Sequence, residues 1–568
     1  MKNVVETIYQ IIEKELECTG LARDWGPVPK NNPGDLAIPC FRIGKALNSS
    51  PPQTAQRLEE ILQKSNTPLI KSCSAAGPYL NIHLNFASLR ETICQRAIEG
   101  SAGKSQIGEG KTVCLDFSSP NIAKEMAFHH LRSTAIGNSL ANIAAHHGYK
   151  VKRINYLGDW GTTHGKLLKA VELFGSEEKL KSEGISYMLS LYIEFNRREK
   201  EDPSLSAAAK EAFCKLEEGD ENYLRLWKLF RDLSISEFEA TYERLGIRYD
   251  EYDGESFYRE KVDGIIDEID QKMGTRISEG ALVTDIEGMK LPILLKKDDG
   301  ASLYITRDLC AVQRRFDDYK FDVHWYVVAH QQKLHFQQLF KTVEKLERPY
   351  ANRCEHIGFG MLSFGDKTMS SRKGNVIFLN DVLNEAKDRA LKIIEEKNPN
   401  LENKHAVADA VGLGAVIFSD LSQNRSKDVK FRWESISFEG DTAPFIQYTF
   451  ARCNSLLEKL NAHQETLSQD TVKENSDSVE CEAHDRLLRE WLYFDYHCER
   501  ALLDKDPSQV AHALLKTAKA FNRLYHDVRF LDETCPKKLQ LWMAIIDGTQ
   551  SILKTGLSLL GIQSPQKM

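Results

Sequence analysis

The sequence predicts a multidomain α/β protein, with a Rossmann-type domain split by a helical insertion, an α+β unit before it and an all-helical bundle after it. Three observations support this fold class. The 568 residues are too many for one hydrophobic core and fit three or four domains. Residues 112–156 read as strand, helix and strand, the pattern of a parallel sheet. After about residue 400 the pattern is almost wholly helical.

The N-terminal unit is expected over residues 1–105. It opens with a surface helix, and a second helix near Pro51–Gln63 is followed by an apolar strand over Tyr79–Leu84. The stretch from Gly100 to Gly110 is typical of a linker. The start lacks the apolar core of a secretory signal, and no apolar stretch is long enough to span a bilayer. We therefore expect a cytoplasmic protein.

The Rossmann-type domain is expected over residues 106–385, with the helical, highly charged insertion at about 165–250. Its two halves each combine strands with helices. The expected elements are a strand over Thr112–Phe117, a helix within 121–147, a strand over Val151–Tyr156, a helix over Asp308–Phe316, a strand over His324–Val328, a helix over Leu334–Leu346 and a strand around His356–Met361.

The rest of the chain reads as helices. Residues 386–440 form a connecting helical region, and residues 441–568 form a separate bundle that begins near Gln447. A polar stretch, Asn461–His484, divides its helices into two groups. An all-helical domain behind an α/β body indicates a macromolecular partner.

Composition limits the classes of function. A hydrophobic content of 42% with 28% charged residues excludes wholesale disorder. The 12 cysteines include no CxxC pair, and neither Cys481 nor Cys498 has a histidine at zinc-finger spacing, so we expect no structural metal. The net charge of −7 argues mildly against a nucleic-acid partner, although a local basic face can exist on an acidic chain.

A first group of chemically active residues lies where the first strand gives way to the first helix. It runs from Ser118 to Thr134 and includes Lys124, His129 and His130. Open parallel sheets bind ligands beyond the carboxyl ends of their strands, and helix N-termini attract phosphate. Histidine and lysine here could neutralise charge on an α-phosphate. Taken alone, such a stretch is more typical of a solvated helix start with a few basic residues.

A second group is the small-residue loop from Gly365 to Asn375. Lys367, Arg372 and Lys373 place three cations within seven residues, which suits a leaving pyrophosphate. The alternative is an exposed basic turn. No GxxxxGK[ST] segment is present, so a P-loop enzyme is excluded.

A third group is centred on Tyr304 and Asp308. If a helix begins at Tyr304, the two side chains lie one turn apart on one face. A carboxylate beside a phenol suits a planar guanidinium, although a core tyrosine next to a surface ion pair is the alternative. Gln331 and Gln332 start the helix after the next strand, where an amide could reach a substrate amino or carboxylate group.

In type and order these motifs resemble the arginyl-tRNA synthetases, a family of class I aminoacyl-tRNA synthetases, over essentially the full chain. Each motif is weak alone, and the series is specific. The runs are SSPNIAK, HLRST, LGDWGT, LYITRD, YVVAHQQ with LHF, MSSRKGN and FNRLYHDVR.

The resemblance implies a role for each matching residue. Asn121 and Gln332 would hold the α-amino side of arginine, and Tyr304, Asp308 and Glu255 its guanidinium. His130 matches the last histidine of the HIGH signature, and residues 369–372 match the KMSKS loop, in which Ser371 replaces a lysine whose phosphate role Lys124 would take. The implied ATP-binding residues are Ser119, Lys124, His130, Met369 and Ser370, and the implied catalytic residues are Lys124, His129, His130, Lys367, Arg372 and Lys373.

Two departures from the family pattern concern catalysis. The HIGH segment reads Ala127-Phe128-His129-His130, so its first histidine is an alanine and its glycine is a histidine. Losing one preorganised donor costs about 3 kcal/mol. Either His129 supplies that donor or Lys124 carries more of the phosphate charge. The first lysine of the KMSKS loop, Lys367, is displaced by one position.

The family implies that Mg²⁺-ATP and L-arginine form arginyl-adenylate, after tRNA has bound, and that the arginyl group is then transferred to tRNA(Arg) by a protein that is usually a monomer. Residues 1–105 would contact the tRNA corner, 386–440 its stem and 441–568 its anticodon. Two alternatives stay open. One is a tRNA- or arginine-binding protein with weak or no catalysis, and the other is a class I synthetase for another amino acid, which the Tyr304–Asp308 pair disfavours.

Overall fold

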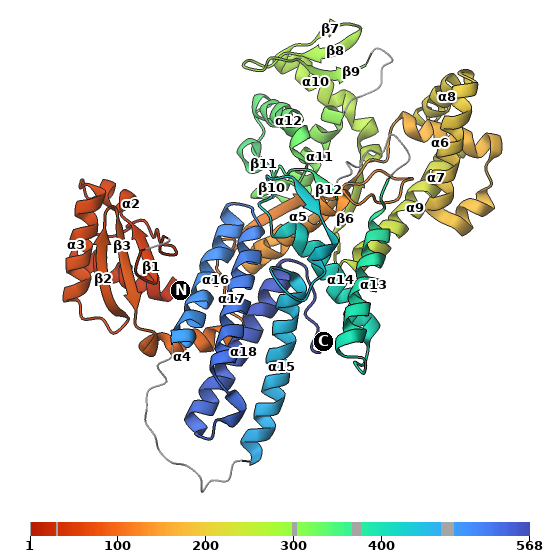
Figure 1. Ribbon diagram of the computed structural model, residues 1–568. Helices are drawn as coiled ribbons and strands as arrows, with labels where there is room; N and C mark the ends of the chain where they lie inside the picture. Colours follow the sequence, from red (N-terminus) through yellow and green to blue (C-terminus); the bar gives the residue numbers. More distant parts are fainter. Residues whose placement is uncertain (1, 30–31, 298–303, 366–375, 467–481) are drawn as a thin grey trace. The chain divides into compact units, whose positions relative to one another are not determined.

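The computed structural model describes residues 2–29, 32–297, 304–365, 376–466 and 482–568 (Figure 1). The chain divides into two compact units. Unit 1 comprises Met1–Ser105, Ala390–Phe418 and Ile436–Met568, and unit 2 comprises Gln106–Arg389 and Ser419–Ser435. Helices α13 (Leu379–Lys397) and α14 (Lys404–Leu421) run from one unit into the other, so the expected connecting region at 386–440 is shared between them.

Unit 2 contains a five-stranded, fully parallel sheet in the order β11-β10-β4-β5-β6. Numbered along the chain, this is the order 3-2-1-4-5 of a dinucleotide-binding fold, which reverses between β4 and β10. Its strands are β4 (Thr112–Asp116), β5 (Lys150–Leu157), β6 (Glu251–Gly254), β10 (Val323–Tyr326) and β11 (Cys354–His356). Its crossover helices are α5 (His130–His146), α11 (Tyr304–Tyr319) and α12 (Lys333–Lys345).

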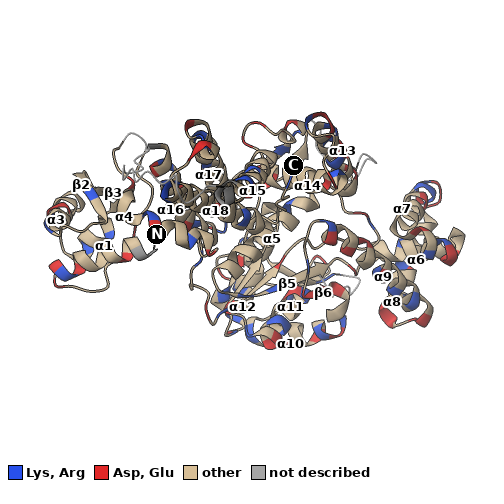
Figure 2. Cartoon of the chain, turned by 90° about the horizontal axis from the view of Figure 1, so that it is seen from below, with Lys and Arg blue, Asp and Glu red and all other residues tan. Residues whose placement is uncertain are grey.

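Two insertions extend unit 2. Four helices connect β5 to β6 and carry charged residues of both signs along their length (Figure 2). They are α6 (Thr162–Phe174), α7 (Glu177–Glu201), α8 (Ser204–Glu218) and α9 (Glu221–Arg244). After β6 follow the 3-10 helix η1 (Glu255–Lys261), α10 (Val262–Met273) and a small antiparallel sheet of β7 (Arg276–Ser278), β8 (Ala281–Thr284) and β9 (Ile293–Lys296).

Unit 1 joins an N-terminal α+β part to a helical bundle. The N-terminal part has an antiparallel sheet in the order β1-β3-β2, and the strand expected over Tyr79–Leu84 is β3. Its other elements are α1 (Lys2–Glu15), β1 (Leu36–Pro39), α2 (Phe41–Ala46), α3 (Pro51–Lys64), β2 (Ile70–Ala76) and α4 (Phe86–Ile98). The bundle contains α15 (Ala443–Thr466), α16 (Glu482–Leu503), α17 (Ser508–Asp527) and α18 (Pro536–Leu559).

The predicted fold class is confirmed, and three expected elements differ in their bounds. The strand expected around His356–Met361 is two short strands, β11 and β12 (Leu362–Phe364), and β12 pairs with β13 (Val429–Phe431). The helix expected from Asp308 begins one turn earlier. Helix α15 continues to Thr466, into the polar stretch expected to separate the helices. Within the described ranges, no helix is both long and apolar enough to cross a membrane.

Candidate active site

The loop after β4 is held in a strained backbone conformation beside the point where the strand order reverses. Ser118, Ser119 and Ala123 have φ values of 72°, 50° and 61°, in the left-handed region that side chains avoid. Such residues cost on the order of 1–3 kcal/mol each and persist where surrounding contacts hold them. Here the Ser133 hydroxyl accepts from the Ser118 amide at 2.9 Å and donates to the Val327 carbonyl at 2.7 Å, so it ties the loop to the end of β10.

Asn121 is placed by the glycine of the LGDWGT motif. The Gly158 amide donates to Pro120 at 3.1 Å, and the Ile122 amide donates to Gly158 at 3.2 Å. A Cβ on Gly158 would collide with Asn121 Oδ1. The backbone therefore approaches this closely only because residue 158 has no side chain, and Asn121 remains exposed at the sheet edge.

Lys124 lies between the loop and the helical insertion. Its Nζ is 5.3 Å from the ring centre of Tyr192 on α7, a cation–π contact. Its charge also acts on two histidines, the half-buried His130 and the buried His164 on α6. Burial lowers the pKa of His164 to about 4, and the nearby lysine adds to the effect.

The two consecutive histidines lie at the start of α5. Their ring centres are 4.3 Å apart. His130 Nδ1 donates to the Ala127 carbonyl at 3.1 Å, which leaves Nε2 without the proton in the neutral ring. Burial lowers the pKa of His130 to about 3, and the neighbouring His129 and Lys124 contribute in the same direction. Without ligands, His130 is therefore neutral at physiological pH.

The HIGH-like segment is anchored beside the ends of the basic loop. The Phe128 amide donates to Ile377, and the Leu379 amide donates to Met126. The Phe128 ring also packs against Phe364, 5.7 Å away. Phe364, before the basic loop, and Ile377, after it, therefore both contact Phe128. The implied loop residues Lys367, Met369, Ser370, Arg372 and Lys373 lie outside the described residues.

Helix α11 is fixed across the sheet by a buried arginine. Arg315 Nη1 donates to Asp116 on β4 at 2.8 Å, and Arg315 Nη2 lies 3.7 Å from Asp253 on β6. Ser119, implied as an ATP ligand, donates its hydroxyl to Asp116 at 3.0 Å. One buried network therefore joins the loop after β4 to the helix that carries Tyr304 and Asp308.

The first turn of α11 brings the expected guanidinium-binding residues together. Tyr304 begins the helix and is 63% exposed, and Asp308 follows one turn later, half-buried. The pKa of Tyr304 is raised, first because its phenol is partly shielded from water although the residue as a whole is exposed, and then because of the negative charge of Glu255 nearby. Burial raises the pKa of Glu255 to about 8 against the opposing charge of Arg307, and Asp308 raises it further.

Residues that the motifs did not single out hold this group in place. Asp159 accepts from both the amide and the hydroxyl of Ser256 at 2.8 Å, which fixes the turn that bears Glu255. Arg307 donates to Glu255 at 2.8 Å, and His335 donates to Asp308 at 2.6 Å. These three residues, Arg307, His335 and Asp159, belong to recognisable motifs. A motif match, however, does not indicate which side chain each of them contacts.

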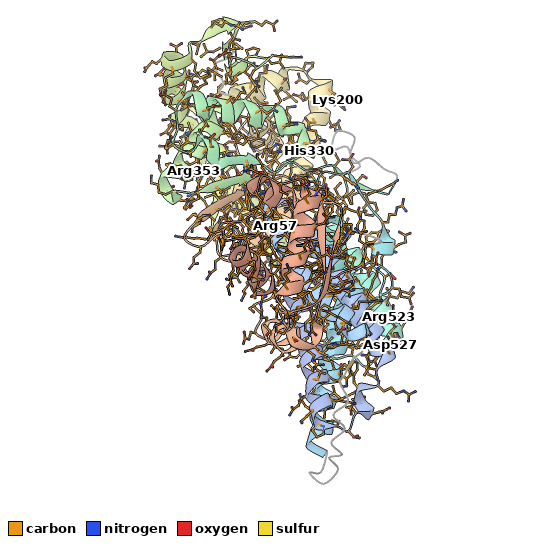
Figure 3. All side chains as sticks on the ribbon, turned by 90° about the vertical axis from the view of Figure 1, so that its left-hand side faces the viewer. Arg57, Lys200, His330, Arg353, Arg523 and Asp527 are labelled. Atoms are coloured by element: carbon orange, nitrogen blue, oxygen red, sulfur yellow. The ribbon has the colours of Figure 1, made fainter. Side chains whose placement is uncertain are left out.

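Gln332 ends the 3-10 helix η2 (His330–Gln332) after β10, where His330 is labelled in Figure 3. Its side chain is exposed. The Gln332 amide donates to Ala329 at 3.0 Å, and the His330 amide donates to Phe359 at 3.0 Å. Gln332 therefore lies after the carboxyl end of β10, as Asn121 lies after that of β4. No group of three or more potential metal ligands occurs among the described side chains.

The parallel sheet, its order and the HIGH-like turn at the start of α5 define a class I aminoacyl-tRNA synthetase. Residues 92–433 match the family described as tRNA synthetases class I (R), catalytic domain. Residues 446–568 match the DALR anticodon binding domain, and residues 6–84 the arginyl tRNA synthetase N terminal domain. The chain belongs to the arginyl-tRNA synthetase family.

The similarity to other proteins extends over almost the whole chain. The arginine–tRNA ligase of Exiguobacterium sibiricum is 41% identical over 539 residues, 94% of each chain. That of Clostridium perfringens is 39% identical and covers 100% of this chain and 99% of its own. The structure of Thermus thermophilus arginyl-tRNA synthetase has a TM-score of 0.80, with 25% identity and full coverage of both chains. These likenesses give no support to a binding protein without catalysis, or to a synthetase for another amino acid.

Proposed function

We propose that this ligase activates L-arginine with Mg²⁺-ATP and transfers it to tRNA(Arg) at the edge of the sheet between β4 and β10. An arginine carboxylate oxygen attacks the α-phosphorus of ATP, and pyrophosphate leaves. A terminal ribose hydroxyl of the tRNA then attacks the carbonyl carbon, and AMP leaves. The observation that carries the proposal is the grouping of Tyr304, Asp308 and Glu255 beside a network that reaches Ser119.

For arginine, the pocket combines charge with planar hydrogen bonding. Asp308 and Glu255 supply carboxylate oxygens and Tyr304 a phenol, which together match a planar guanidinium. Asn121 and Gln332 lie after two neighbouring strands, where their amides can hold the amino and carboxylate end of the substrate. The substrate would thus extend along the sheet edge toward the loop at 118–124.

For ATP, basic side chains gather at the start of α5. Lys124 and His130 lie close enough to interact, and the N-terminus of α5 adds a favourable dipole. An incoming triphosphate favours the protonated form of His130, whose Nε2 then donates to phosphate. His129 is adjacent and can supply the donor absent at Ala127. Ser119, Met369 and Ser370 are proposed to bind ATP, and Lys367, Arg372 and Lys373 to stabilise the leaving pyrophosphate.

For tRNA, we assign each part of the chain a different contact. Residues 1–105 are proposed to contact the corner of the tRNA, residues 386–440 its stem and residues 441–568 its anticodon. The family matches at 6–84 and 446–568 support the first and last assignments. By resemblance to the family, we further propose a monomeric, cytoplasmic enzyme.

The pocket assignment is tested with Asp308→Ala. Loss of the carboxylate leaves the guanidinium without its ionic partner, so arginine-dependent ATP–pyrophosphate exchange should fall on the order of 10²–10³-fold. Binding of tRNA(Arg) should be unchanged. The control is Asp317→Ala, an exposed carboxylate on the same helix. Undiminished exchange in Asp308→Ala, with that control also active, would overturn the assignment.

A further inference from the structure

The histidine of the LHF motif contacts the proposed arginine pocket from a second helix. His335 lies in the first turn of α12, and its Nε2 is 2.6 Å from Asp308 Oδ2 on α11. Both side chains are partly enclosed, with exposures of 23% and 18%. The His335 ring also packs edge-on against Phe336, whose centre is 5.3 Å away. The contact therefore fixes the orientation of Asp308 relative to the sheet edge.

The neighbouring carboxylates are already matched by arginines. Asp116 pairs with Arg315 at 2.8 Å, and Glu255 pairs with Arg307 at 2.8 Å. The carboxylates of Asp159 and Asp253 are likewise within 3.7 Å of an arginine nitrogen. Asp308 differs from these four carboxylates. Among the described residues of unit 2, the side chain that pairs with it is a histidine and not an arginine. A histidine donates to a carboxylate through a single ring nitrogen, so it fixes one oxygen and does not cover both as an arginine fork can.

The hydrogen bond also gives the two carboxylate oxygens of Asp308 different roles. A carboxylate oxygen only accepts, so Nε2 carries the hydrogen and Oδ2 is its acceptor. Among the described residues, no donor contacts Oδ1, which can therefore accept from a substrate. A guanidinium presents several N–H donors in one plane, and a carboxylate held at a fixed angle meets them with less loss of freedom than a rotating one.

We propose that His335 is a positioning residue for arginine recognition, which holds Asp308 so that its charge and its Oδ1 face the substrate guanidinium. The inference rests on the proposed role of Asp308. Because His335 acts through Asp308 and not on ATP, its loss should affect the KM for arginine and leave the KM for ATP and kcat nearly unchanged.

The test uses two polar replacements of different reach in the full-length enzyme. The amide nitrogen of glutamine can occupy the place of Nε2, whereas that of asparagine falls short of Oδ2. In ATP–pyrophosphate exchange, His335→Asn should raise the KM for arginine on the order of tenfold to a hundredfold, the loss of a hydrogen bond to a charged group. His335→Gln should stay within about threefold of the unaltered enzyme. Gln337→Ala, exposed on the same helix, is the control.

The outcomes separate this inference from the proposed function. An equal rise of the arginine KM in both variants, or an equal change in kcat and the KM for ATP, would mean that His335 is only structural. An unchanged KM in His335→Asn, with exchange lost in Asp308→Ala, would refute the role of His335 alone. Undiminished exchange in Asp308→Ala would refute the proposed arginine pocket, on which the role of His335 rests. Thermal unfolding of each variant identifies a loss caused by misfolding.

Discussion

Glu255 and Arg307 form an ion pair that is almost fully enclosed, with side-chain exposures of 8% and 6%. Burial raises the pKa of Glu255, and the negative charges of Asp308 and Asp159 act in the same direction. The guanidinium of Arg307 opposes them. Arg307 therefore makes a buried carboxylate tolerable next to two others, and it does so with the same chemical group that the substrate carries.

Replacing Arg307 with methionine should destabilise the protein. Removing one partner of a buried pair leaves the other unpaired, at a cost of about 3 kcal/mol. We expect that loss in the free energy of unfolding by urea at pH 7.5. Without the opposing charge of Arg307, the pKa of Glu255 rises above its value of about 8 in the unaltered protein, so the stability of the variant should go on falling as pH rises toward 9.

The matched experiment is the double variant Arg307→Met with Glu255→Gln. It has no unpaired buried charge, so it should recover most of the lost stability. A double variant no more stable than Arg307→Met would show that Arg307 acts through its other contacts.

At this scale the sequence predicts residue types better than partners. The motifs place Tyr304 and Asp308 one turn apart, and α11 does begin at Tyr304. Arg307 stands between them in the same motif, but its pairing depends on Glu255, 52 residues away in sequence. The contact between His335 and Asp308 similarly joins two helices. Spacing along a chain carries no information on such pairings, because the sheet topology creates them.

Helix α5 illustrates how tertiary contacts set the limits of an element. The helix predicted within residues 121–147 is α5, which starts at His130, so the first nine residues of that range are not part of it. The preceding residues are irregular because Ile122 bonds to Gly158 and Phe128 bonds to Ile377. Both partners lie far along the chain, so local periodicity could not indicate the break. This irregular stretch is the part that carries Asn121 and Lys124.

Gly158→Ala should disturb that stretch. The added methyl would overlap Asn121 Oδ1, and overpacking of this kind costs about 1–3 kcal/mol. Because Asn121 would have to move, the KM for arginine should rise, with a smaller loss of thermal stability. The measurement is ATP–pyrophosphate exchange as a function of arginine concentration.

The control for that experiment is Gly264→Ala. Gly264 lies within α10 and has open space around its Cβ position, so alanine should raise helix stability by up to about 1 kcal/mol and leave arginine binding unchanged. An unaltered arginine KM in Gly158→Ala would show that the loop can absorb the methyl group.

For the whole molecule, length and pattern predict the fold class, but not how the chain is distributed between its units. After residue 389 the chain is divided into three segments, which belong in turn to unit 1, unit 2 and unit 1. Residues 419–435 belong to unit 2 because β13 pairs with β12, although both flanking segments belong to unit 1. The pairing of residue 362 with residue 429 is nonlocal. A prediction from local sequence patterns therefore groups β13 with the helices on either side of it.

Because the chain forms two compact units, a change made in one unit should alter the stability of that unit and not of the other. His497 on α16 lies in unit 1, where it is buried and bonded to Gln509 at 3.0 Å. Burial lowers the pKa of His497 to about 4, and Lys516 and His512 add to the effect. The unfolded histidine binds a proton below about pH 6.5 and the folded one does not. Its contribution is therefore complete above pH 6.5 and decreases as pH falls toward 4.

His497→Gln keeps the polar side chain and removes the titration. Relative to the unaltered protein, the variant should gain about 2 kcal/mol of stability between pH 6.5 and pH 5. Hydrogen exchange, corrected for intrinsic rates, should show this gain in α16 and α17 and not in β4 or β5. The two pairs of elements lie in different compact units, and we expect each unit to open by itself. An equal gain in both units would mean that the chain opens as one body, through the helices α13 and α14 that the two units share.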